Sequence, residues 1–117
     1  MMKEFIEYNN IEIINNEELT VKVNITENTL NPYKIVHGGL IFSLGDTVMG
    51  MMCQKLGRKA VTLDSSINFL SPGVGKYLVA TCNILKDGRK TCVLEAKIKN
   101  DKGKLVATMT GTYFYIE

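Results

Sequence analysis

The stretch IVHGGLIFSLGDTVMGMMCQKLG, residues 35–57, decides the fold. It predicts one long helix that begins at or just after His37, Gly38 and Gly39. At 100° per residue, apolar side chains occupy two faces of this helix. The first face holds Leu40, Ile41, Leu44, Val48, Met51 and Met52, and the second holds Phe42, Met49, Gly50 and Cys53 around Asp46. A helix that is apolar on both sides is buried on both sides, so one sheet does not suffice to cover it.

Strand signals lie on both sides of the helix. Residues 18–26 alternate apolar and polar side chains, and residues 11–18 supply an earlier strand with a hairpin at Asn15 and Asn16. Four further strands are predicted at 60–71, 76–86, 90–100 and 104–116, with the turns DGR and NDKG between the last three. We therefore expect an antiparallel meander after one long helix, in a single domain over residues 1–117.

Composition excludes several classes of protein. The net charge is +2, and no basic stripe is interleaved with aromatic residues, so we expect no nucleic-acid binding. The start MMKEFIEYNN lacks the pattern of a signal peptide. The uncharged stretch at residues 35–45 is too short to span a bilayer. We expect a cytoplasmic protein with no membrane partner.

Cysteine and histidine usage argues against a metal site. Cys53, Cys82 and Cys92 are odd in number and widely spaced, so they predict neither a disulfide framework nor a metal or redox pair. We expect three buried, reduced thiols. Since His37 is the only histidine, a histidine metal cluster and a Ser-His-Asp triad are also disfavoured.

The helix start and Asp46 suggest chemistry on an acyl group. The first amides of a helix lack internal partners, and glycine allows close approach, so the Gly38 N–H is a natural oxyanion donor. Asp46 lies roughly 12 Å further along the helix, too far to act on the same carbon within one chain. In an antiparallel two-fold dimer, however, Asp46 of one helix lies beside Gly38 of the other. This arrangement suits attack on an activated acyl carbon, with Asp46 as general base or nucleophile.

Four segments, HGGLIFSLGD, TLDSSINFLSPG, ILKDGRK and GKLVATMTGTYF, together with Asn31, resemble the hotdog-fold acyl-CoA thioesterases, in particular the phenylacetate-degradation (PaaI-like) type. The resemblance covers residues 31–116. It implies an α+β hotdog domain with an antiparallel sheet of five or six strands wrapped around the helix. It also implies hydrolysis of a small, medium or aryl acyl-CoA by a homodimer with a continuous sheet, often a homotetramer built from two dimers. No metal or bound cofactor is implied, because coenzyme A arrives as part of the substrate.

The resemblance also assigns roles to residues. Asn31 and His37 position the thioester and the helix start, the Gly38 N–H binds the thioester carbonyl oxygen, and Asp46 of the other subunit is the carboxylate. Thr62 matches a position where a hydroxyl helps to orient the water.

Further polar residues are candidates for substrate binding. Gly39 shares the helix start, and Asp64 lies with Asn68 and Thr62 on one parity of a predicted strand. Basic residues gather at the predicted turns, where they suit the phosphates of coenzyme A. They are Arg58, Lys59, Lys86, Arg89 and Lys90. Lys34 stands where many relatives have glycine.

Simpler explanations compete with these roles. His37 also fits a capping residue, Asn31 a turn residue before Pro32, and Asp46 a partner in an interfacial hydrogen bond. For the whole chain, the alternative is a non-catalytic protein that binds acyl-CoA or an acyl carrier in the same pocket. Replacing Asp46 distinguishes the two, because only an enzyme would keep binding and lose turnover. A hotdog dehydratase ranks below both, since it needs a different placement of acid and base residues.

Overall fold

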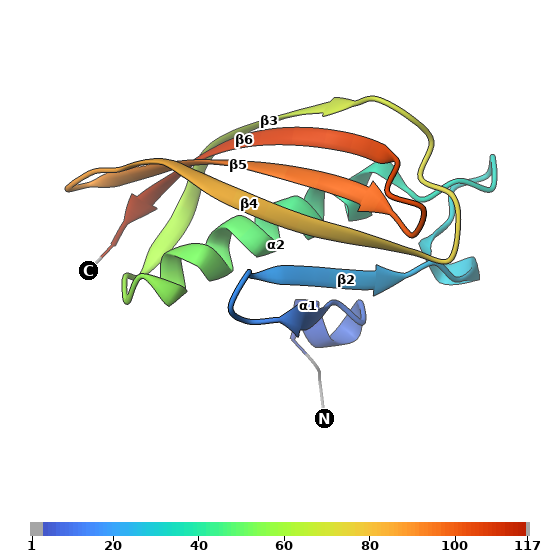
Figure 1. Ribbon diagram of the computed structural model, residues 1–117, viewed down its shortest axis with the longest axis horizontal. Helices are drawn as coiled ribbons and strands as arrows, with labels where there is room; N and C mark the ends of the chain where they lie inside the picture. Colours follow the sequence, from blue (N-terminus) through green and yellow to red (C-terminus); the bar gives the residue numbers. More distant parts are fainter. Residues whose placement is uncertain (1–3, 117) are drawn as a thin grey trace.

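The long helix, α2 (Gly38–Lys55), lies across one face of a curved sheet in the computed structural model, which describes residues 4–116 (Figure 1). Its buried residues recur at helical spacing on one stripe. They are Ile41, Leu44, Gly45, Val48, Met49 and Cys53. The helix ends in a Schellman motif, because Gly57 has a left-handed φ of 78° and Arg58 N–H donates to the Cys53 carbonyl at 3.2 Å.

Six strands form one antiparallel sheet in the order β1-β2-β4-β5-β6-β3. The strands are β1 (Glu12–Asn15), β2 (Thr20–Asn24), β3 (Ala60–Phe69), β4 (Tyr77–Asp87), β5 (Thr91–Asn100) and β6 (Leu105–Tyr115). Two short helices, α1 (Phe5–Tyr8) and the 3-10 turn η1 (Glu27–Thr29), flank the β1–β2 hairpin. The predicted α+β hotdog arrangement is confirmed.

The order of the strands corrects the expected meander. β4, β5 and β6 do follow one another as hairpins, but β3 pairs with β6 at the far edge of the sheet. Helix α2 explains this order. Its 18 residues carry the chain roughly 27 Å across the concave face, so that β3 begins on the side opposite β2.

The division of α2 into two apolar faces also needs correction. Met49 and Cys53 belong to the core stripe, because the sheet wraps around the flank that carries them. Phe42 and Gly50 stay half-exposed beside Asp46. The second face is therefore open in a single chain, and its burial by another chain stays a prediction.

The cysteines are free thiols, as predicted. Cys53 and Cys92 are buried, whereas Cys82 is only half-buried, because it lies in β4 on the flank of the core. Burial is the main cause that raises the pKa of Cys53 to about 12 and that of Cys82 to about 11. Among residues 4–116, neither α2 nor a shorter helix has the length and apolar character of a membrane span.

Candidate active site

The start of α2 leaves one backbone donor open. His37 is the N-cap, and its Nδ1 accepts a hydrogen bond from the Gly39 N–H at 2.9 Å. The His37 carbonyl accepts from the N–H groups of Leu40 and Ile41 at 3.0 and 3.2 Å. Within residues 4–116, the Gly38 N–H has no acceptor. It is therefore the one amide of the first helical turn that is available to an oxyanion.

The two ring nitrogens of His37 have different roles in this arrangement. Nδ1 is the acceptor for the Gly39 N–H, and Nε2 is the nitrogen that is left to donate. His37 thus organises the helix start through its cap, which is the capping explanation considered from the sequence.

Asn31 belongs to the turn that leads into the helix. Its Oδ1 accepts from the N–H groups of Tyr33 and Ile35 at 2.9 and 3.3 Å. Lys34, in the same turn, has a left-handed φ of 66°, the conformation that glycine adopts most readily. The turn role of Asn31 is therefore present, and Asn31 also lines the cavity next to Gly38.

A largely apolar cavity adjoins Gly38; we call it the helix-start cavity. It has a volume of about 450 Å³, and both Gly38 and Asn31 line it. Its other walls come from the turn before α2 and from the end of β3 onward. They are Ile35, Val36, Ile41, Phe69, Leu70, Ser71, Pro72 and Gly73. No charged side chain contributes to this lining, so the cavity suits an apolar group beside the open amide.

Asp46 is held at one oxygen only. Its Oδ1 accepts hydrogen bonds from the Thr62 hydroxyl at 2.7 Å and from the Tyr113 hydroxyl at 2.5 Å. The Tyr113 hydroxyl also lies 3.0 Å from the Asp46 carbonyl oxygen. Within the described chain, no hydrogen bond reaches Oδ2. One carboxylate oxygen therefore stays available for a water molecule or an acyl carbon.

The Asp46 cavity, as we name the second pocket, has a volume of about 590 Å³. Asp46, Thr62 and Tyr113 line it together with apolar and neutral residues of α1, α2 and β3. The two cavities have no lining residue in common. The structure thus brings Asp46 together with Thr62, and Gly38 together with Asn31, but it does not bring these two pairs together in one chain.

A β-bulge separates Thr62 from Asp64. Thr62 pairs with Tyr113, whereas Asp64 pairs with Thr112, so Leu63 is the extra residue. Because paired residues share a face of the sheet and successive residues alternate, Thr62 faces α2 and Asp64 faces away. The expected common parity of Thr62 and Asp64 is therefore wrong. Asp64 and Asn68 do lie on the same face of β3, as expected.

The predicted basic turns form a third, smaller cavity of about 410 Å³, which Arg58, Arg89 and Lys90 line. The Arg58 guanidinium donates to the carbonyl oxygens of Gly88 and Arg89 at 3.1 and 2.7 Å and lies 3.5 Å from the centre of the Tyr115 ring. Arg58 thus fixes the β4–β5 turn, while the side chains of Arg89 and Lys90 are exposed on it.

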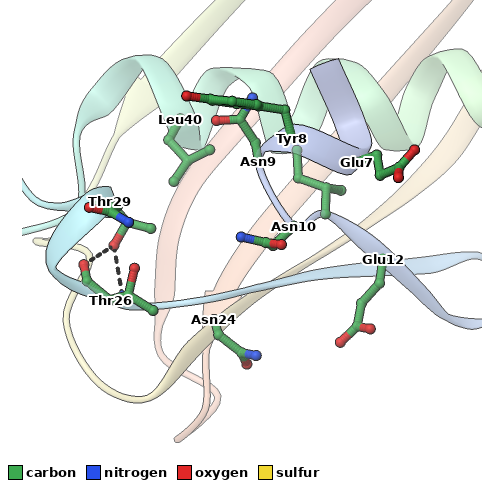
Figure 2. A pocket seen from close by; sticks show the side chains of 11 residues that line it. Glu7, Tyr8, Asn9, Asn10, Glu12, Asn24, Thr26, Thr29 and Leu40 are labelled. Carbon is green, nitrogen blue, oxygen red and sulfur yellow. Dashed lines mark hydrogen bonds between the residues drawn. The ribbon is translucent and has the colours of Figure 1, made fainter. Parts of the chain in front are cut away.

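A further cavity, of about 730 Å³, has neither Asp46 nor Gly38 in its lining; Figure 2 shows its side chains. Residues of α1, β1, the end of β2 and η1 surround it, with Leu40 of α2 at one wall. Glu7 and Glu12 contribute carboxylates, and its described lining contains no lysine or arginine. This charge pattern does not suit the phosphates of a nucleotide.

Tyr113 is a residue of the site that the sequence did not reveal. It contacts Asp46 because β6 pairs with β3, and the register of two strands about 50 residues apart cannot be read from either strand alone. The alternation of aromatic residues in TYFY indicates only that Tyr113 and Tyr115 share a face.

Comparison with known proteins gives one family. Residues 33–107 match the thioesterase superfamily. The acyl-coenzyme A thioesterase PaaI of Escherichia coli is 36% identical over 104 residues, covering 86% of this chain and 74% of that protein. The acyl-coenzyme A thioesterase 13 of Mus musculus is 33% identical over 95 residues, covering 78% and 68%.

The same relationship holds among solved structures. A Bacillus halodurans protein crystallised with CoA has a TM-score of 0.91 and 34% identity, covering 96% of this chain and 78% of that one. The chain therefore belongs to the thioesterase superfamily and is a hotdog-fold thioester hydrolase related to the PaaI type.

Proposed function

We propose that this protein is a homodimeric acyl-CoA thioesterase whose active site is shared between two subunits. The observation that carries the proposal is the separation of two open groups, the Gly38 amide and Asp46 Oδ2, in different cavities of one chain. A two-fold partner with an antiparallel α2 would bring one of each together. The names of the curated relatives and the CoA in the Bacillus halodurans structure support acyl-CoA as the substrate.

In the proposed reaction, Oδ2 of Asp46 takes a proton from a water molecule, which attacks the thioester carbon. The carbonyl oxygen becomes an oxyanion, which the N–H of Gly38 of the partner subunit stabilises. When the tetrahedral intermediate collapses, the carbon–sulfur bond breaks, and the proton on Asp46 passes to the departing thiolate. The free acid and CoA leave. Direct attack of the carboxylate on the thioester is the alternative first step and uses the same oxygen.

The edge of β3 supports the dimer. β3 has ten residues and pairs only with β6 among the described strands, so its other edge is open. Leu63 and Phe69 on this strand are 62% and 54% exposed. A long open edge is rare in a monomer because it invites pairing. Pairing of two β3 strands would give the continuous sheet, and a tetramer would add a second contact between dimers.

The exposed side chains of Arg89 and Lys90 are proposed to bind the phosphates of coenzyme A. Both lie on the β4–β5 turn that Arg58 fixes, so their backbone positions are already set before substrate arrives. Charge-assisted contacts from a fixed turn cost less ordering than contacts from a free loop.

The test is thiol release from short, medium, long and aryl acyl-CoAs, measured on the wild type and on Asp46→Asn. Loss of a positioned base lowers kcat by about 10² to 10⁴. Asp101→Asn is the matched control, because Asp101 accepts the Lys76 N–H at a distant turn and an asparagine oxygen keeps that bond.

Two outcomes would contradict the proposal. Full turnover in a folded Asp46→Asn dimer would remove the role of the carboxylate. A wild type that binds acyl-CoA but releases no thiol from any ester of the panel would favour the binding-protein alternative.

A further inference from the structure

We propose that Tyr113 is a positioning residue that holds Asp46 through Oδ1, so that Oδ2 faces the Asp46 cavity. This inference rests on the proposed function, because it assigns a role to Asp46 in turnover. Tyr113 itself contacts no reacting atom in this scheme.

The contacts of Tyr113 fix the carboxylate in two ways. Its hydroxyl donates to Oδ1 at 2.5 Å and lies 3.0 Å from the backbone carbonyl of the same residue. The hydroxyl therefore spans the side chain and main chain of Asp46 and restricts rotation of the carboxylate. Thr62 donates to the same oxygen at 2.7 Å from the neighbouring strand. With two donors on Oδ1, the other oxygen is the one left for the reaction.

The ring of Tyr113 fits a space that Gly111 leaves open. A Cβ on Gly111 would lie 2.9 Å from the ring, closer than packed side chains approach. Tyr113 is only 2% exposed. The absence of a side chain at Gly111, on β6, lets a large aromatic ring enter between helix and sheet with its hydroxyl at Asp46. A phenylalanine at position 113 would keep this packing and lose only the hydroxyl.

The electrostatic surroundings make Tyr113 a constant donor. Burial and the neighbouring Asp46 raise the pKa of Tyr113 well above its ordinary value, so the hydroxyl keeps its proton over the working range of an enzyme. Cys53 of α2 adds to this rise, and its own raised pKa of about 12 keeps the thiol neutral.

Among the described residues, no further ionisable group lines the Asp46 cavity. The other described residues that line the Asp46 cavity come from α1, α2 and β3, and none of them titrates. In the proposed dimer, His37 of the partner subunit would join the site. A hydrogen bond to the charged form of an acid favours that form, and Tyr113→Phe removes one of the two donors to Oδ1.

The experiment compares Tyr113→Phe with the wild type in kcat, KM and the pH dependence of kcat, using the best substrate of the thiol-release panel. We expect kcat to fall about 10- to 100-fold with little change in KM. The acidic limb of the pH profile should move upward, because one donor to the carboxylate is lost. A merely structural role would not move this limb.

Tyr115→Phe is the matched control. Tyr115 lies two residues further on the same strand, is buried, and donates to Oδ1 of Asp87 at 2.5 Å. Its loss removes an equally short bond to a carboxylate at another place, so the acidic limb should stay where it is in the wild type. If the limb moved equally in both variants, the inference about Tyr113 would be overturned.

The failure of this inference can be told apart from failure of the proposed function. If Asp46→Asn abolishes turnover while Tyr113→Phe retains the wild-type kcat and acidic limb, only the role of Tyr113 is wrong. If Asp46→Asn is fully active, the proposed function fails first. Should Tyr113→Phe not fold, 3-fluorotyrosine at position 113 keeps the ring and makes the hydroxyl a stronger donor to Oδ1. The acidic limb should then move downward, and a limb that stays at its wild-type position would overturn the proposal.

Discussion

Asp46, Gly38 and His37 are residues whose arrangement follows from local spacing. A helix has a fixed rise and rotation, so the eight positions between Gly38 and Asp46 already separate the two groups along the axis. The cap at His37 is likewise a local feature, because it joins residues two positions apart. These parts of the candidate site could be predicted from the sequence.

The contacts of Thr62 with Tyr113 and Asp46 could not be predicted in the same way. They depend on the register of β3 against β6 and on a bulge at Leu63. A shift of one residue moves the side chains of a strand to the opposite face. Asp64 therefore faces away from α2, contrary to the prediction, whereas Thr62 faces α2 and Asp46. The amino-acid types around Leu63 give no local signal of such a bulge.

Cys53 gives a residue-scale prediction on pH. Its thiol ionises at the ordinary value of 9.0 in the unfolded chain but only at about 12 in the folded one, chiefly because of burial. The unfolded state therefore binds fewer protons above pH 9, so the stabilising contribution is full below pH 9 and is lost as the pH rises toward 12.

We expect the free energy of unfolding to decrease between pH 9 and 10 and the decrease to be shallower in Cys53→Ala. Urea unfolding at fixed protein concentration measures it. Cys82 contributes in the same direction, since its pKa is raised to about 11, so some decrease should persist in the variant. An unchanged pH dependence in Cys53→Ala would show that this thiol does not resist ionisation in the folded protein.

At the scale of elements, the helix and the strands themselves were predictable because each follows a short periodic pattern. The observed bounds of β3 to β6 lie within about two residues of the predicted ones. The order of the strands could not be predicted from the pattern. A strand has the same alternating sequence whether a hairpin or a helix connects it to the strand before it, so the sequence does not indicate which strand it pairs with. The segment that forms α1, FIEY, has only four residues, fewer than a periodic signal needs.

The contact of α2 with the sheet yields a prediction from two glycines of the same helix. A Cβ on Gly45 would lie 2.1 Å from the Met109 sulfur, whereas a Cβ on Gly50 would meet only the Tyr113 ring at 3.9 Å. Gly45→Ala should therefore destabilise the protein by about 1–3 kcal/mol through overpacking. Gly50→Ala should instead stabilise it by up to about 1 kcal/mol, because alanine favours the helix.

Chemical denaturation of the two variants at equal protein concentration measures whether the substitutions change the free energy of unfolding in opposite directions. If Gly45→Ala were as stable as the wild type, the close approach of α2 to β6 would not be a constraint on the fold.

At the scale of the whole molecule, a site shared between two subunits needs one open group from each chain. The Gly38 N–H and Asp46 Oδ2 meet this need, because they lie in separate cavities of one chain. Substitutions can remove each group with little disturbance. Asp46→Asn removes the carboxylate, and Gly38→Pro removes the open N–H. Proline is favoured at the first position of a helix, and His37, with φ −57° and ψ 131°, already has the extended conformation that a residue before proline adopts. Gly38→Ala keeps the N–H and serves as the steric control, since its Cβ would lie 3.3 Å from the Phe69 ring.

The most direct test of the shared site is therefore complementation between Asp46→Asn and Gly38→Pro chains. Each variant alone should release little thiol from acyl-CoA. When the two chains are co-expressed with different affinity tags and the mixed dimer is purified, one of its sites combines an intact Asp46 with an intact Gly38. The account predicts that the mixed dimer recovers about half of the wild-type activity per dimer. A mixed dimer that stays as inactive as its parents would contradict it and place both groups of the reaction in a single chain.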